Sequence, residues 1–189
     1  MDNIGVIHGR FQVLHLDHLK YLLAGKELCR HLVVGITNPD PFLTRAEEAD
    51  PDRSDPPANP LNYFERYQMV KAVLREAGLD FREFSIVPLP INMPERYQYY
   101  VPADAVFFLS IYDDWGRRKL RYFQKMGLKT HVLWEVSPEE KGISGREVRE
   151  RMRGGQPWQH MVPPGVSLLM EKWEIPERLK QLFQNTERA

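Results

Sequence analysis

Short apolar runs alternate with amphipathic segments along most of the chain. Five runs have the length and composition of buried strands, and they lie at residues 3–8, 31–37, 84–89, 104–110 and 129–134. Three segments between them repeat apolar residues at helical spacing, at 17–30, 63–77 and 115–126. Because strands alternate with helices, the pattern predicts an α/β fold with a five-stranded parallel sheet.

Two parts of the chain do not follow this alternation of strands and helices. From Ser144 helical spacing continues to the end of the chain, with breaks at Gly154-Gly155 and Pro163-Pro164, so residues 142–189 form a helical C-terminal region. Residues 38–60 contain six prolines, many acids and few aliphatic residues. They predict a long inserted loop, which is either a lid over a site or a surface insertion. A chain of 189 residues has room for one such domain, covering 1–189.

Charge and cysteine content exclude several functional classes. Lys+Arg is 26 and Asp+Glu is 26, and this zero net charge argues against a nucleic-acid partner or a polybasic membrane surface. No apolar run reaches the roughly 20 residues that span a bilayer. Cys29 is the sole cysteine, which excludes an intrachain disulfide and a Cys-rich zinc module. We therefore expect a cytoplasmic protein in which Cys29 is a buried apolar residue.

Residues suited to phosphate binding follow the first predicted strand. Arg10 comes directly after Gly9, and His15 and His18 lie three residues apart at a helix start, where both imidazoles can face the same side of the first turn. An arginine and free helix amides bind phosphate without high net charge. In parallel sheets ligands bind beyond the carboxyl ends of the strands, which supports a crevice at this position.

A second candidate element begins at Ser144. Ser144 is a natural N-cap and Glu147 stands three residues later, which predicts a capping box. Arg149 follows in the same helix. The segment is either a well-capped helix or the second half of a phosphate site.

These two elements resemble the motifs of the nucleotidylyltransferase superfamily. Residues 9–18 are similar to its opening, which carries an H-x-G-H motif, and residues 143–149 are similar to its later I-S-S/A-T-x-I-R motif. The likeness is greatest to archaeal-type nicotinamide mononucleotide adenylyltransferases, whose N-P-F-x-x-x-E-R and G-E-P-W segments have counterparts at 59–66 and 155–158. The resemblance runs from about Ile4 to Trp173.

The resemblance implies a Rossmann-like, doubly wound sheet and a reaction. ATP would transfer its adenylyl group to the 5′-phosphate of nicotinamide mononucleotide, giving NAD and pyrophosphate, with Mg²⁺ bridging the phosphates. The implied catalytic residues are His15, His18, Arg66 and Arg149. The implied ATP-binding residues are Gly9, Arg10, Phe11, Gln12, Ser144 and Arg146. Asn92 and Tyr97 would bind the nicotinamide, unless their loop is ordinary packing, and the family often forms homo-oligomers.

Two of the chain's departures from the family pattern bear most on its reaction. Asp17 stands where the family has glycine, and its charge opposes a bound polyanion unless the side chain turns away or pairs with Lys20 or an arginine. Residues 109–112 replace a small, Gly-Asn-containing stretch. These departures leave two alternatives to adenylyl transfer. One is nucleotidyl transfer with another acceptor or base, such as CTP-dependent cytidylyl transfer, and the other is a non-catalytic nucleotide-binding module. A metal site at His8, His15, Asp17 and His18 is a further hypothesis.

Overall fold

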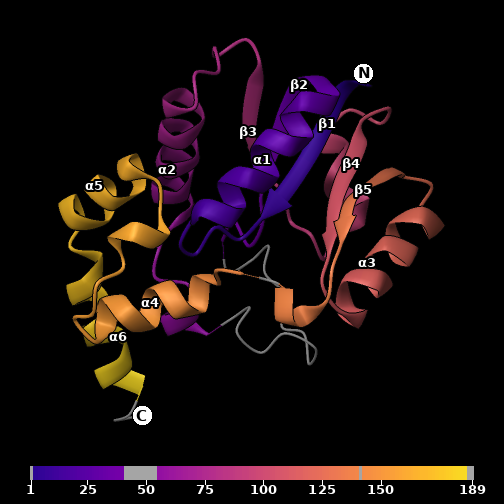
Figure 1. Cartoon of the computed structure of the whole chain (residues 1–189). Helices are drawn as coiled ribbons and strands as arrows, with labels where there is room; N and C mark the ends of the chain where they lie inside the picture. The colour runs from indigo at the N-terminus through magenta and orange to yellow at the C-terminus, as the bar shows by residue number, and fades with distance from the viewer. Residues whose placement is uncertain (1, 41–54, 141, 187–189) are drawn as a thin grey trace.

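Five parallel strands form a single sheet in the described part of the chain. The computed structural model describes residues 2–40, 55–140 and 142–186. The strand order is β3-β2-β1-β4-β5, and every adjacent pair is parallel (Figure 1). The strands are β1 Asp2–Gly9, β2 Cys29–Ile36, β3 Phe84–Pro88, β4 Val106–Ile111 and β5 Lys129–Glu135. This order confirms the doubly wound, Rossmann-like sheet and places its switch point between β1 and β4.

Helices cover both faces of the sheet, and three more lie beside it. The helices are α1 Leu16–Leu28, α2 Tyr63–Glu76, α3 Asp114–Lys125, α4 Gly145–Arg153, α5 Pro164–Lys172 and α6 Ile175–Thr186. α5 contacts α2, and α4 contacts α6, so the C-terminal region packs as a helical layer beside α2 (Figure 1). None of the helices in the described ranges combines the length and apolar character needed to cross a membrane.

Strand side chains alternate between two hydrophobic cores, as period-2 geometry requires. Ile7 of β1 and Val34 of β2 point into the core shared with α1, α2 and the C-terminal helices. Val6 and Leu109 point the other way and pack with Phe123 of α3. Cys29 is buried in the first core, which confirms its predicted apolar role.

The predicted boundaries differ from the structure mainly at two places. The C-terminal helical region has a further break between α5 and α6, where Glu174 adopts a positive φ of 52°. Pro176, in the first turn of α6, is typical of a helix start, but the predicted breaks did not include it. The predicted loop 38–60 is described at its two ends, while residues 41–54 lie outside the described residues. Its last part contains a 3-10 turn, Pro56–Ala58, that contacts α6.

Candidate functional site

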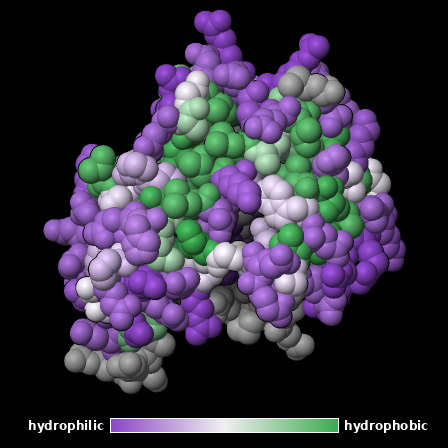
Figure 2. All heavy atoms as spheres, in the orientation of Figure 1, coloured by the Kyte–Doolittle hydropathy of each residue, from purple (hydrophilic) through white to green (hydrophobic). Residues whose placement is uncertain are grey.

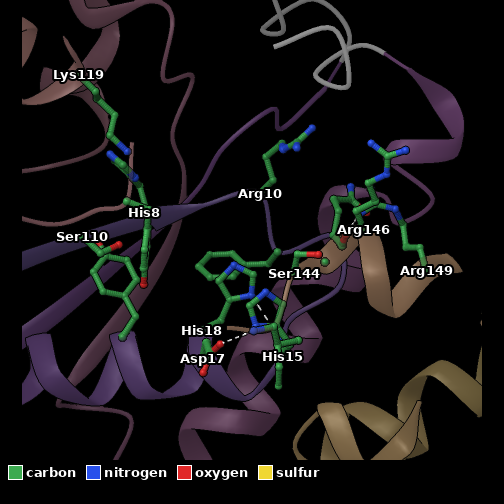
Figure 3. A pocket seen from close by; sticks show the side chains of 16 residues that line it. His8, Arg10, His15, Asp17, His18, Ser110, Lys119, Ser144, Arg146 and Arg149 are labelled. Atoms are coloured by element: carbon green, nitrogen blue, oxygen red, sulfur yellow. Dashed lines mark hydrogen bonds between the residues drawn. The ribbon is translucent and has the colours of Figure 1, made fainter. Parts of the chain in front are cut away.

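A cavity of about 460 Å³ lies at the carboxyl ends of β1 and β4. Its wall comes from the β1–α1 loop, the first turn of α1, the end of β4, and the segment that leads into α4 (Figure 3). This is the switch point of the sheet, where doubly wound proteins bind ligands. The volume is within the range of about 300–1,000 Å³ found for small-molecule sites.

The cavity wall is rich in positive charge although the chain as a whole is neutral. The cationic side chains among its described lining are Arg10, Lys119, Arg146 and Arg149, and Asp17 is the acid among them. The hollow at the centre of the face shown in Figure 2 is bordered by both hydrophilic and hydrophobic residues. The first turns of α1 and α4 add the positive ends of two helix dipoles. This arrangement favours a small ligand with several negative charges.

His15 and His18 form a stacked pair at the start of α1. Their ring centroids are 3.7 Å apart, and the His15 backbone N–H donates to His18 Nδ1 at 3.3 Å (Figure 3). Burial and the neighbouring His15 hold the pKa of His18 well below its ordinary value of 6.5, so this imidazole is neutral at pH 7. Since Nδ1 accepts, the proton lies on Nε2. His18 therefore offers one neutral N–H donor to a ligand.

The start of α4 lies against the β1–α1 loop. Ser144 caps the helix, because its Oγ accepts from the Glu147 N–H at 3.1 Å. Arg149 Nη1 donates to the backbone carbonyl of Gln12. A Cβ on Gly145 would lie 2.8 Å from that same carbonyl oxygen, so the approach requires glycine. The two sequence motifs thus meet at one wall of the cavity.

The predicted capping box of α4 is half formed. Ser144 acts as the cap, but the Glu147 carboxylate accepts from Arg151 Nε at 3.3 Å, one helical turn later. This i,i+4 pair holds the glutamate along the helix, which replaces the predicted return bond to the Ser144 amide.

Asp17 turns its carboxylate toward the segment before α4. Its Oδ2 accepts from the Ile143 backbone N–H at 2.7 Å. The side chain turns to a backbone amide while it still lines the cavity, so a hydrogen bond offsets part of its charge without moving it away from the ligand site. Asp17 bridges the two motifs.

Arg66 lies away from the cavity, in contrast to its predicted role at phosphate. It is buried, and its guanidinium donates to the carbonyls of Thr37 at 2.6 Å, Asn38 at 2.7 Å and Arg10 at 3.0 Å. Burial lowers its pKa to about 10, so the group remains charged at pH 7. Arg66 holds the loops after β1 and β2 together, and it acts on the cavity through the position of Arg10.

Other residues of the predicted motifs also serve the fold. The Gln12 side chain donates to the Leu61 carbonyl at 2.7 Å and accepts from the Leu61 N–H at 2.9 Å, so its amide is occupied although the residue lines the cavity. Gly9 ends β1, and its carbonyl accepts from the Thr37 N–H at 2.9 Å. Glu65 forms two 2.8 Å bonds with Arg178 of α6.

The two residues predicted to bind the nicotinamide lie in different surroundings. Tyr97 is buried, donates to the Ile91 carbonyl and packs against Phe107, so it belongs to the core. Asn92 lines a second cavity of about 270 Å³ together with Arg118 and Lys119. Lys119 lines both cavities, so they share a wall.

Several cavity residues were missing from the implied catalytic and binding residues, although His8 belonged to the metal-site hypothesis. His8, the residue before the last of β1, lines the cavity and packs edge-on against Phe123 at 5.6 Å between ring centroids. Ser110 and Tyr112 line the cavity from the end of β4. The sequence indicates this position, because ligands of parallel sheets bind beyond the carboxyl ends of the strands. Lys119 has no such signal, because in sequence it is one of several charged residues on an amphipathic helix. Across the described ranges, no group of three or more His, Cys, Asp or Glu side chains is arranged to hold a metal ion.

Comparisons with known proteins agree with this geometry. A family model described as "Cytidylyltransferase-like" matches residues 6–151. The chain is 52% identical over 176 residues to a phosphonoformate cytidylyltransferase of Streptomyces viridochromogenes, covering 93% of this chain and 95% of the relative. It is 27% identical over 190 residues to a nicotinamide-nucleotide adenylyltransferase of Thermococcus onnurineus, covering 100% and 93%.

A solved structure shows the same fold. It is a bifunctional NMN adenylyltransferase/ADP ribose pyrophosphatase from Francisella tularensis, with a TM-score of 0.69 and 15% identity. The match covers 99% of this chain and 54% of that one. The chain therefore corresponds to about half of this larger protein.

Proposed function

Because the chain belongs to the cytidylyltransferase-like family of nucleotidyltransferases, we propose that it transfers the cytidylyl group of CTP to a small phosphonate of the phosphonoformate class. The observation that carries this proposal is the 52% identity to a phosphonoformate cytidylyltransferase over nearly the whole length of both chains. Identity to the adenylyltransferase of Thermococcus onnurineus is 27%. This contrast favours the cytidylyl alternative over adenylyl transfer to nicotinamide mononucleotide, which was our first expectation.

The proposed reaction is a displacement at the α-phosphorus of CTP. A phosphonate oxygen attacks that phosphorus, a new P–O–P bond forms, and the bond to the β-phosphate oxygen breaks with release of pyrophosphate. The protein contributes position and charge stabilisation, as in other phosphoryl-type transfers. The cations Arg10, Arg146 and Arg149 and the two helix starts suit the triphosphate. The Nε2–H of His18 is a fixed donor for charge that develops on the transferred group.

The second cavity supports a small anionic acceptor. Arg118 and Lys119 bring two cations to its wall, and Asn92 adds an amide. A phosphonate that also carries a carboxylate presents two anionic groups, which two separated cations are able to match. Because Lys119 also lines the first cavity, an acceptor bound here lies next to the triphosphate.

Mg²⁺ is the metal that the family implies, and the donor set is consistent with an ion carried by the substrate. Magnesium in such sites is held by substrate phosphates with one or two carboxylates. Asp17 is the acid among the described lining residues, and one of its oxygens accepts from Ile143. When bound, Mg²⁺ would neutralise charge on the phosphates.

Pyrophosphate release tests the proposal directly. The purified chain is incubated with CTP or ATP, each with phosphonoformate or nicotinamide mononucleotide, in the presence of Mg²⁺. We expect release with CTP and phosphonoformate, at a kcat/KM at least about tenfold above the ATP pair, which corresponds to about 1.4 kcal/mol of discrimination. Release confined to ATP and nicotinamide mononucleotide would restore the first expectation. An absence of release from every pair would favour the non-catalytic module.

A further inference from the structure

We propose that Asp17 is a positioning residue that joins the first turn of α1 to the start of α4 and so sets the width of the nucleotide site. The inference rests on the proposed nucleotide site, and it assigns a role to the aspartate that stands in the place of the superfamily's glycine. Its basis is a set of contacts between segments more than 120 residues apart.

The first contact is the hydrogen bond from Ile143 N–H to Asp17 Oδ2. At 2.7 Å it is a short bond, as expected for a carboxylate acceptor. Ile143 directly precedes Ser144, the residue that caps α4. A shift at Ile143 therefore moves the capping residue and the helix start that line the cavity.

The second observation is the fit of Gly142 against the carboxylate. Gly142 has φ +66°, and a Cβ built there would lie 2.4 Å from Asp17 Oδ2. Any other residue would meet both the unfavourable backbone region and the carboxylate. The chain thus matches an acid on α1 with a glycine before α4, and the two positions form one unit.

The third observation is a separate pair of contacts on the other side of the same junction. Arg149 donates to the Gln12 carbonyl, and Gly145 approaches that carbonyl too closely for a side chain. These contacts hold the body of α4 to the β1–α1 loop. Without Asp17, Ile143 would lose its hydrogen bond to α1, and the segment 142–144 would depend on the contacts of α4 for its position.

The Asp17 carboxylate affects binding of a triphosphate in two opposite ways, one electrostatic and one structural. Its charge repels the ligand, whereas its hydrogen bond holds the amides and the cap of α4 in place. One oxygen is engaged by an N–H group, which offsets part of the charge. The proposal states that the structural effect is the larger one, so removal of the carboxylate weakens nucleotide binding despite the loss of repulsion.

Three substitutions separate these effects. Asp17→Ala and Asp17→Gly remove both charge and acceptor, whereas Asp17→Asn keeps a carbonyl oxygen for Ile143 and removes the charge. We expect the alanine and glycine variants to raise the KM for CTP, and the Kd measured by calorimetry, about tenfold, with kcat within about threefold, since about 1.4 kcal/mol of binding is lost. The asparagine variant should match or exceed the wild-type affinity. Glu27→Ala, which removes an exposed acid from the same helix, is the matched control.

Amide hydrogen exchange at Ile143 provides a readout that needs no substrate. We expect faster exchange at this amide in Asp17→Ala and wild-type protection in Asp17→Asn. Failure of the proposed reaction would leave this measurement untouched, so the two proposals fail separately. An alanine variant that binds CTP as well as or better than wild type would overturn the inference. So would an asparagine variant as impaired as the alanine one, or unchanged exchange at Ile143.

Discussion

The backbone N–H of His15 donates to Nδ1 of His18 at 3.3 Å, and the two rings stack with centroids 3.7 Å apart. This contact occupies one ring nitrogen of His18 and leaves the protonated Nε2 as its donor. The two histidines thus have different roles, because His15 donates through its backbone N–H and this contact fixes the tautomer of His18. The stacking of the two rings depends on the geometry of the helix start, since residues three positions apart lie on the same face of a helix.

Removal of the His18 donor should reduce turnover more than binding. Loss of one fixed donor to a transition state costs about 10²–10³ in kcat. We expect His18→Ala to lose turnover of that size in the pyrophosphate assay, while circular dichroism and the melting temperature show a folded protein. His160→Ala, at an exposed histidine outside the cavity lining, is the control and should keep wild-type turnover. A His18→Ala enzyme within about threefold of wild type would contradict the assignment.

The lowered pKa of His18 makes stability depend on pH in a defined direction. In the unfolded chain the imidazole takes up a proton near its ordinary value of 6.5, whereas in the folded protein it does so well below that value. Between these two values the unfolded state binds more protons, so the free energy of unfolding falls as the pH is lowered below about 6.5. Urea denaturation at pH 7.5 and 5.5 measures this fall, and His18→Gln should reduce it. An equal fall in both proteins would contradict the prediction.

Substitution of Arg66 should destabilise the fold. Three backbone carbonyls from two loops accept from its buried guanidinium, and a lysine is able to reach fewer of them. We expect Arg66→Lys to lower the free energy of unfolding by about 3 kcal/mol, because buried carbonyls lose their partners. Arg82→Lys, at a side chain that is 96% exposed, should change it by less than about 0.5 kcal/mol. Equal stabilities for the two variants would argue that Arg66 is dispensable for the fold.

Tyr97 should act on stability through its hydroxyl. This group is buried and donates to the Ile91 carbonyl, so Tyr97→Phe leaves that carbonyl without its donor at a cost of about 1–3 kcal/mol. Asn92, which faces the second cavity, should behave differently, and Asn92→Ala should raise the KM for the acceptor. Chemical denaturation and acceptor titrations of both variants test the distinction. If Tyr97→Phe raised the KM for the acceptor more than Asn92→Ala did, Tyr97 would belong to the binding site.

Much of the fold was predictable because its signals are local. The short apolar runs located all five strands of the described sheet, and Ser144 marks a helix start that the structure confirms. The break at Glu174 was not predicted, although Pro176 stands in the first turn of α6 and is typical of a helix start.

The candidate site was predictable in part. His15, His18, Arg10 and Ser144 follow a strand or begin a helix, and such positions gather at the carboxyl edge of a parallel sheet. Arg66 was assigned to phosphate through the resemblance to the family motif at 59–66, but its nearest acceptors are carbonyls of Thr37 and Asn38, nearly 30 residues away in sequence.

The sequence by itself determined the alternation of strands and helices, the helix starts suited to an anionic ligand, and the two histidines that share a helical face. These properties depend on side chains a few residues apart, whose spacing is set by backbone geometry. The tertiary structure alone decided that Asp17 faces Ile143, that Arg66 serves the loops, and that Lys119 reaches both cavities. A polar side chain takes the partner that packing brings within about 3 Å, and packing joins segments that the linear order keeps far apart.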